Sequence, residues 1–189
     1  MYDAVTKEQT IVNGVNVDEM VSTIEAISEQ RELAVFQFRA RNEWLGGARN
    51  QTSVKDVFGG GQEQRRARAH VMQKDEPAFL LGTDQAANPV EYLLAALAGC
   101  LTTTLVFFAA AEGLRLDEVT SRFEADGSLL GFLGLDESAR MGFEEIRGTF
   151  DIKSAAPREK IEELLALAQS RSGVFDMLTN RTPVAVRLA

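Results

Sequence analysis

Residues 88–103 carry the strongest structural signal in the chain and read Asn-Pro-Val-Glu-Tyr-Leu-Leu-Ala-Ala-Leu-Ala-Gly-Cys-Leu-Thr-Thr. Asn88 and Pro89 are typical of a helix start, because asparagine caps free N–H groups and proline needs no hydrogen bond in the first turn. Glu91 follows where the helix dipole favours a negative charge. The small and apolar residues beyond it predict a long buried helix that ends at Gly113.

This apolar stretch, residues 90–111, is about as long as a membrane span. It nevertheless contains Glu91, Gly99 and three consecutive threonines at positions 102–104. These residues favour burial inside a protein over contact with lipid, so we expect no membrane partner.

The remaining hydrophobic periodicity predicts a mixture of helices and strands. Helices are predicted over residues 17–30 and from Pro157 to about Arg171, and strands over 34–40, 51–58, 66–72, 77–81, 119–125, 146–153 and 184–188. The pattern indicates an α+β fold. At 189 residues one core is the default, so we expect a single domain over 1–189, with 1–32 as a helical extension and 33–189 as the core.

Composition and charge exclude several classes of function. The chain is 45% hydrophobic and 25% charged, as a globular protein is. Its net charge of −8 repels a phosphate backbone, and the small basic cluster Arg65, Arg66 and Arg68 does not reverse that. We therefore expect no nucleic-acid partner.

A single cysteine, Cys100, makes an internal disulfide impossible and fits a reducing cytoplasm. The first nine residues contain no apolar segment of the signal-peptide type, which also favours a cytoplasmic location. Cys100 is the candidate nucleophile, although free cysteines are often simply buried packing residues.

Other chemistries find little support in the sequence. The only histidine, His70, is far along the chain from Cys100, and no group of residues has the spacing of metal ligands, so neither a metal nor another cofactor is expected. The glycine run 59–61 lacks the Lys-Ser/Thr of a phosphate loop and predicts a turn.

The helix of residues 88–103 resembles the OsmC/Ohr family, whose members carry the pattern Asn-Pro-x-x-x-Leu-x-x-Ala-x-x-x-Cys. Further similarity to one branch of that family covers nearly the whole chain, in segments 36–44, 81–84, 131–135, 174–180 and 183–184. The resemblance implies two central helices wrapped by curved antiparallel sheets, and an intertwined homodimer. It also implies a reactive cysteine at Cys100 and reduction of organic hydroperoxides.

The same resemblance suggests partners for the sulfur. A thiol attacks peroxide as the thiolate, and a nearby arginine favours that form. By motif position Arg49 is the candidate for this role and Arg39 is the alternative. Glu91 is the candidate carboxylate that orients the arginine, although the peroxidases usually carry it one residue earlier, where this chain has Val90.

A second departure concerns the residue that resolves the oxidised cysteine. Two-cysteine members of the family carry Cys-Pro near the end of the second central helix, and here Ser172-Gly173 takes that place. Serine forms no disulfide, so the cycle requires an external thiol. The hypotheses are a one-cysteine thiol peroxidase, a non-catalytic protein that binds a small apolar ligand or senses redox state, and an interaction protein that uses its N-terminal helix.

Overall fold

The computed structural model describes residues 9–189, and these form an α+β arrangement with several antiparallel sheets. The predicted fold class is therefore confirmed. The described chain divides into two compact units, residues 9–10 with 16–93 and residues 11–15 with 94–189. The single domain over 1–189, with its extension over 1–32, stays a prediction.

In the described part of the first unit lie the α-helix α1, two short 3₁₀ helices and two small sheets. Helix α1 begins after Asn16, whose side-chain oxygen accepts from the Glu19 N–H at 3.2 Å, so the predicted N-terminal helix is confirmed. Strands β3, β4 and β7 form an antiparallel sheet in that order, and β5 pairs with β6. The elements are α1 (Val17–Glu29), η1 (Arg31–Ala34), β3 (Arg41–Gly46), β4 (Arg49–Val54), β5 (Val57–Gly59), β6 (Gln62–Gln64), β7 (His70–Lys74) and η2 (Ala78–Leu80).

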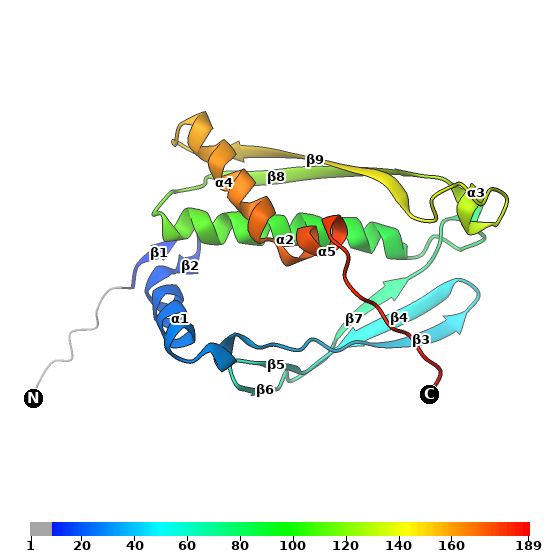
Figure 1. Cartoon of the computed structure of the whole chain (residues 1–189), viewed down its shortest axis with the longest axis horizontal. Coiled ribbons are helices and arrows are strands. Elements are labelled where there is room, and N and C mark those ends of the chain that lie inside the picture. The colour runs from blue at the N-terminus through cyan, green and yellow to red at the C-terminus, as the bar shows by residue number, and fades with distance from the viewer. Residues whose placement is uncertain (1–8) are drawn as a thin grey trace, which may run out of the picture. The chain divides into compact units, whose positions relative to one another are not determined.

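The second unit is built on the long helix α2, whose first turns still belong to the first unit. Strands β8 and β9 form a long antiparallel hairpin that runs along α2 (Figure 1). The elements are β1 (Ile11–Val12), β2 (Val15–Asn16), α2 (Pro89–Ala111), β8 (Glu118–Gly127), α3 (Leu129–Phe132), β9 (Phe143–Lys153), α4 (Arg158–Arg171) and α5 (Gly173–Thr179).

The core of this unit lies where the two predicted central helices meet. Leu105 and Ala109 of α2 pack with Leu164 and Ala168 of α4, and all four are fully buried. Because a leucine buried in this way contributes about 1.5–3 kcal/mol, this contact fixes the helix pair. By length and composition α2 could cross a membrane, but these contacts make it a core helix.

Several predicted strands differ from the structure. Residues 78–80 form the 3₁₀ helix η2 instead of a strand, and Leu81 then adopts a left-handed conformation with φ +64°. Residues 34–40 contain only the last residue of η1 and one isolated bridge at Gln37, and the strand begins only at Arg41. Residues 184–188 belong to no strand among the described residues, although their pattern is strand-like.

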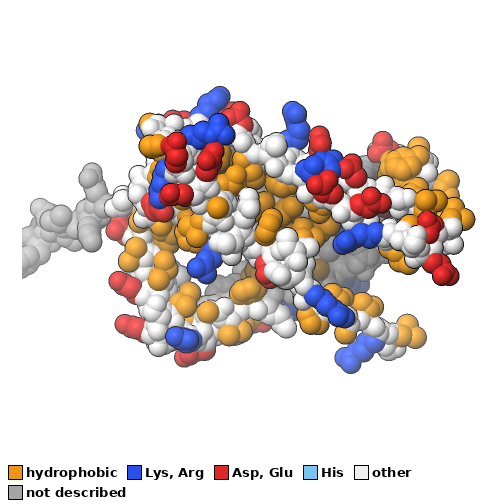
Figure 2. All heavy atoms as spheres, turned by 45° about the horizontal axis from the view of Figure 1, so that its top comes forward, with side chains coloured by type: hydrophobic (Ala, Val, Ile, Leu, Met, Phe, Trp, Pro, Cys, Tyr) orange, Lys and Arg blue, Asp and Glu red, His pale blue; other side chains and the backbone are white. Residues whose placement is uncertain are grey.

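Exposed apolar side chains gather over α3 and the turn that follows it, at the right of Figure 2. The largest exposures in this segment are those of Phe132 (72%) and Leu135 (70%). The extended C-terminal segment exposes Val184, Val186 and Leu188 even more fully. Single exposed apolar residues are normal on proteins, whereas several gathered on one face form an apolar patch.

Candidate active site

The helix that carries the cysteine begins with two reciprocal hydrogen bonds. The side-chain oxygen of Asn88 accepts from the Glu91 N–H at 2.9 Å, and the Glu91 carboxylate accepts from the Asn88 N–H at 2.8 Å. This pair is a capping box, which satisfies two backbone donors that the first turn leaves free. It fixes the residue at which α2 starts and therefore the direction in which each later side chain points.

Cys100 lies in the middle of α2, is partly exposed, and meets a serine that is far away in the sequence. The hydroxyl of Ser172 donates to the Cys100 sulfur at 3.1 Å, across a separation of 72 residues. Ser172 is only 1% exposed and stands between α4 and α5. Its oxygen also accepts from the Phe175 N–H at 3.2 Å, so one buried hydroxyl caps α5 and contacts the thiol.

These contacts favour the ionised form of the sulfur. Burial raises the pKa of the Cys100 thiol, but hydrogen bonds from the Ser172 hydroxyl and from the Val174 and Gly173 N–H groups outweigh burial. The pKa of Cys100 therefore lies below its ordinary value, with a small further lowering from Thr104. A cysteine that only fills space among aliphatic groups has a raised pKa, so this site differs from a packing cysteine.

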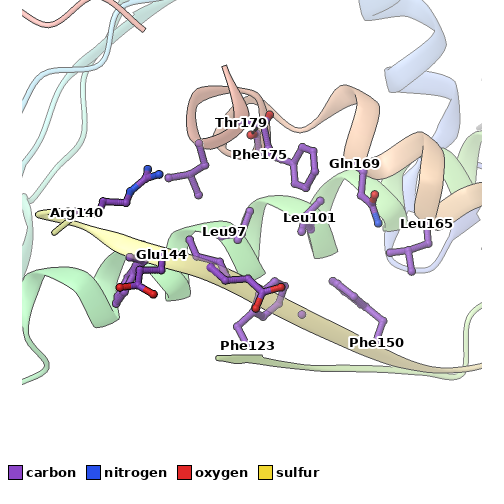
Figure 3. A pocket seen from close by; sticks show the side chains of 15 residues that line it. Leu97, Leu101, Phe123, Arg140, Glu144, Phe150, Leu165, Gln169, Phe175 and Thr179 are labelled. Carbon is purple, nitrogen blue, oxygen red and sulfur yellow. Dashed lines mark hydrogen bonds between the residues drawn. The ribbon is translucent and has the colours of Figure 1, made fainter. Parts of the chain in front are cut away.

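A cavity of about 350 Å³ adjoins the residues around the thiol, and Figure 3 shows the side chains that enclose it. Leu101 follows Cys100 on α2, and Phe175 lies in the first turn of α5, which Ser172 caps; both line the cavity. Cys100 itself is not among the lining residues. The remaining walls are Leu97, Phe123, Arg140, Phe143, Glu144, Glu145, Ile146, Gly148, Phe150, Leu165, Gln169, Leu178 and Thr179.

The hairpin wall of this cavity depends on one glycine. Phe123 on β8 pairs with Gly148 on β9, and the Phe123 ring lies edge-on to Phe150 at 5.9 Å between centroids. A Cβ atom at position 148 would overlap the Phe123 ring. Glycine therefore allows the ring to lie across the strand and to form part of the cavity wall.

The predicted partners of the sulfur lie in the first unit, whereas Cys100 lies in the second. Arg49 begins β4 and, with Lys74 and the buried Asp75, lines a separate cavity of about 170 Å³. Glu91 uses one carboxylate oxygen in the capping box. The alternative, Arg39, forms an ion pair with Glu63 at 2.6 Å. The roles of Arg49, Arg39 and Glu91 beside Cys100 stay predictions.

His70 opens strand β7 and is exposed. Within residues 9–189, no group of three or more histidine, cysteine or acidic side chains is arranged to hold a metal ion. The Cys100 thiol contacts a buried polar partner, the Ser172 hydroxyl.

The sequence predicted only that Ser172 takes the place of a resolving cysteine. It did not predict the hydrogen bond from Ser172 to the Cys100 sulfur. It also missed α5, the short helix that this serine caps. The sequence did contain a local signal for α5, because serine is one of the residues preferred at the position just before a helix, as Ser172 is here. The contact with Cys100 had no local signal, because it joins two segments that only the packing of α4 on α2 brings together.

Fold and site together define a class: an α+β protein with a partly exposed, hydrogen-bonded thiol on a long core helix. The family model for OsmC-like protein matches residues 82–187, which is more than half of the chain. The chain therefore belongs to the OsmC-like protein family, as its cysteine helix predicted.

Solved structures share the fold of this chain. The chain is similar to an OsmC-like protein from Mycoplasma pneumoniae, with TM-score 0.59 and 16% identity over 77% of this chain and 89% of that one. It is also similar to an organic hydroperoxide resistance protein OsmC from Legionella pneumophila, with TM-score 0.52 and 17% identity over 77% and 90% of the two chains. At these identities the likeness shows the fold. No curated protein matches the chain.

Proposed function

We propose that this protein reduces organic hydroperoxides through the thiolate of Cys100, with an external thiol as the reductant. The observation that carries the proposal is the hydrogen-bonded sulfur: Ser172 donates to it at 3.1 Å, and neighbouring N–H groups lower its pKa. The thiolate is the nucleophilic form of cysteine, and its partial exposure gives a peroxide access to it.

In the first step the thiolate attacks the terminal oxygen of the hydroperoxide. A sulfur–oxygen bond forms, the oxygen–oxygen bond breaks, and the alkoxide that leaves takes a proton from water to become an alcohol. The sulfur is oxidised to sulfenic acid while the peroxide is reduced.

The second half of the cycle requires an external thiol, because Cys100 is the only cysteine in the chain. A first thiol attacks the sulfenic acid, which gives a mixed disulfide and water. A second thiol then attacks the mixed disulfide and releases the Cys100 thiolate and an external disulfide. Without a reductant the sulfenic acid is open to irreversible oxidation.

The cavity lined by Leu97 and Leu101, on the same helix as Cys100, supports an organic substrate. Its walls are mostly leucine, isoleucine and phenylalanine side chains, and its volume of about 350 Å³ is within the range of small-molecule sites. An alkyl or aryl group placed there stays close to the residues that flank Cys100, namely Leu97 and Leu101. The family resemblance points to the same substrate class.

We further propose that the protein acts as a cytoplasmic homodimer in which Arg49 stabilises the thiolate and Glu91 orients Arg49. The exposed apolar side chains favour a partner surface, since Phe36, Phe38 and Trp44 of the first unit are 65%, 73% and 76% exposed. Val186 and Leu188 of the C-terminal segment are 92% and 99% exposed. Light scattering on the purified protein tests the dimer, and a monomer at micromolar concentration contradicts it.

The decisive experiment compares wild type with Cys100→Ser for the loss of tert-butyl hydroperoxide in the presence of dihydrolipoamide. We expect the variant to fall to the rate measured without protein, because an alcohol does not replace the thiolate. Equal rates for the two proteins would refute the peroxidase proposal.

A matched pair of arginine variants tests the role of Arg49. Arg49→Met is expected to slow peroxide reduction, whereas Arg41→Met is expected to leave it unchanged, since Arg41 is highly exposed and pairs only with Glu43. Equal rates in the two variants contradict an electrostatic role for Arg49.

A second candidate function is binding of a small apolar ligand without catalysis, and the cavity favours it. Calorimetric titration with cumyl alcohol separates the two. Binding by wild type and by Cys100→Ser, together with no peroxide turnover by either protein, supports the binding function over the enzyme.

A further inference from the structure

We propose that Ser172 is a positioning residue for Cys100: its buried hydroxyl donates to the sulfur and holds it at the start of α5. This inference rests on the proposed function and deepens it. It assigns a role to a residue that would otherwise count only as the absence of a second cysteine.

The geometry leaves the Ser172 hydroxyl little freedom. A serine hydroxyl has one proton to donate and lone pairs to accept. Here the proton is directed to the Cys100 sulfur at 3.1 Å, and the oxygen accepts from the Phe175 N–H at 3.2 Å. At 1% exposure, no bulk water competes for either bond. The side chain is therefore fixed from both directions.

The consequence for the sulfur follows from charge. A thiolate accepts hydrogen bonds from every donor around it, whereas a neutral thiol gains less from the same donors. The Ser172 hydroxyl is a neutral donor to the sulfur, and the N–H groups of Gly173 and Val174 in the same turn also lower the pKa of the thiol. This turn favours the thiolate without a positive charge.

The same contact orients the sulfur. Cys100 sits on a helix, where its side chain could adopt more than one rotamer, and a fixed donor selects the rotamer that faces Ser172. Attack on an oxygen–oxygen bond requires a fixed direction of approach, so a selected rotamer contributes to the rate as well as to ionisation.

The test measures the pH dependence of Cys100 alkylation by iodoacetamide in the full chain, which reports the thiol pKa whether or not the protein has peroxidase activity. Ser172→Gly removes the hydroxyl at little cost to the α5 cap, because glycine is tolerated at that position. We expect its alkylation midpoint to rise by about one to two pH units, which is the loss of one hydrogen bond to a charged group.

Ser172→Thr keeps a hydroxyl and is expected to restore a midpoint close to that of wild type. A purely structural role of Ser172 in capping would change the melting temperature but not this midpoint. Ser172→Ala removes the same hydroxyl and gives the same test if the glycine variant does not fold.

The inference is overturned if the glycine or alanine variant titrates as wild type does, or if the threonine variant titrates as the glycine variant does. Failure of the proposed function looks different. In that case Cys100→Ser and wild type consume peroxide equally, while the effect of Ser172 on the alkylation midpoint remains.

Discussion

Replacing Ser172 by cysteine is expected to convert the hydrogen bond at the site into a disulfide with Cys100. The Ser172 oxygen and the Cys100 sulfur are 3.1 Å apart, and a disulfide requires about 2.05 Å. A shift of about 1 Å between α2 and the turn before α5 therefore closes the bond.

The expected gain in stability follows from the length of chain that the bond encloses. Residues 100 and 172 are separated by 72 positions, and closing a loop of that length removes unfolded-state entropy equivalent to about 4 kcal/mol. For a chain of this size, that corresponds to a rise in melting temperature of about 8–16 °C. Strain from the small shift reduces this value.

The assay compares oxidised and reduced forms of the same Ser172→Cys variant. Both forms lack the Ser172 hydroxyl, so the difference in their melting temperatures reports the disulfide alone. Thiol titration after mild oxidation is expected to find no free thiol, and calorimetry to find a higher melting temperature in the oxidised form. Ser170→Cys is the control, because Ser170 is exposed and its hydroxyl bonds to the Leu167 carbonyl. If both thiols of the Ser172 variant stay free, the two side chains do not meet as described.

Two further predictions concern the helix start and the cavity wall. Asn88→Ala should lower the free energy of unfolding in urea by about 1 kcal/mol, because the helix loses its cap. Glu91→Gln keeps an acceptor for the Asn88 N–H, so its free energy of unfolding should stay within about 0.3 kcal/mol of the wild-type value. Equal destabilisation by both changes contradicts this account of Glu91, and lost peroxidase activity in a stable Glu91→Gln variant supports its catalytic role. Gly148→Ala should cost about 1–3 kcal/mol because its Cβ meets the Phe123 ring, while Gly142→Ala, with no atom within 4 Å, should be tolerated. Similar unfolding curves for the two alanine variants would show that the Phe123 ring moves aside without cost and would contradict this prediction.

The long helices followed from the sequence because their signals are local. Asn88 and Pro89 start α2 where the pattern predicted, and the chain from Pro157 forms α4. Caps, prolines and helical periodicity act within a few residues of one another, so they need no knowledge of the rest of the chain.

The strand predictions were less accurate, because a strand is defined by its partner. Residues 184–188 alternate as a strand does, yet Val184, Val186 and Leu188 are exposed and belong to no sheet among the described residues. Residues 119–125 and 146–153 carry the same kind of pattern and do pair, as β8 and β9. Alternation predicts a capacity to pair, and tertiary structure decides whether a neighbour is present.

For the site, the sequence by itself determined that the only thiol sits on a long core helix and that no second cysteine accompanies it. Tertiary structure alone decided what surrounds that thiol. The packing of Leu164 and Ala168 on Leu105 and Ala109 carries the end of α4 to Cys100, and so places the Ser172 hydroxyl at the sulfur. The physical reason is range: a helix is specified by neighbours three and four residues apart, whereas the pKa of a thiol depends on donors that only folding brings together.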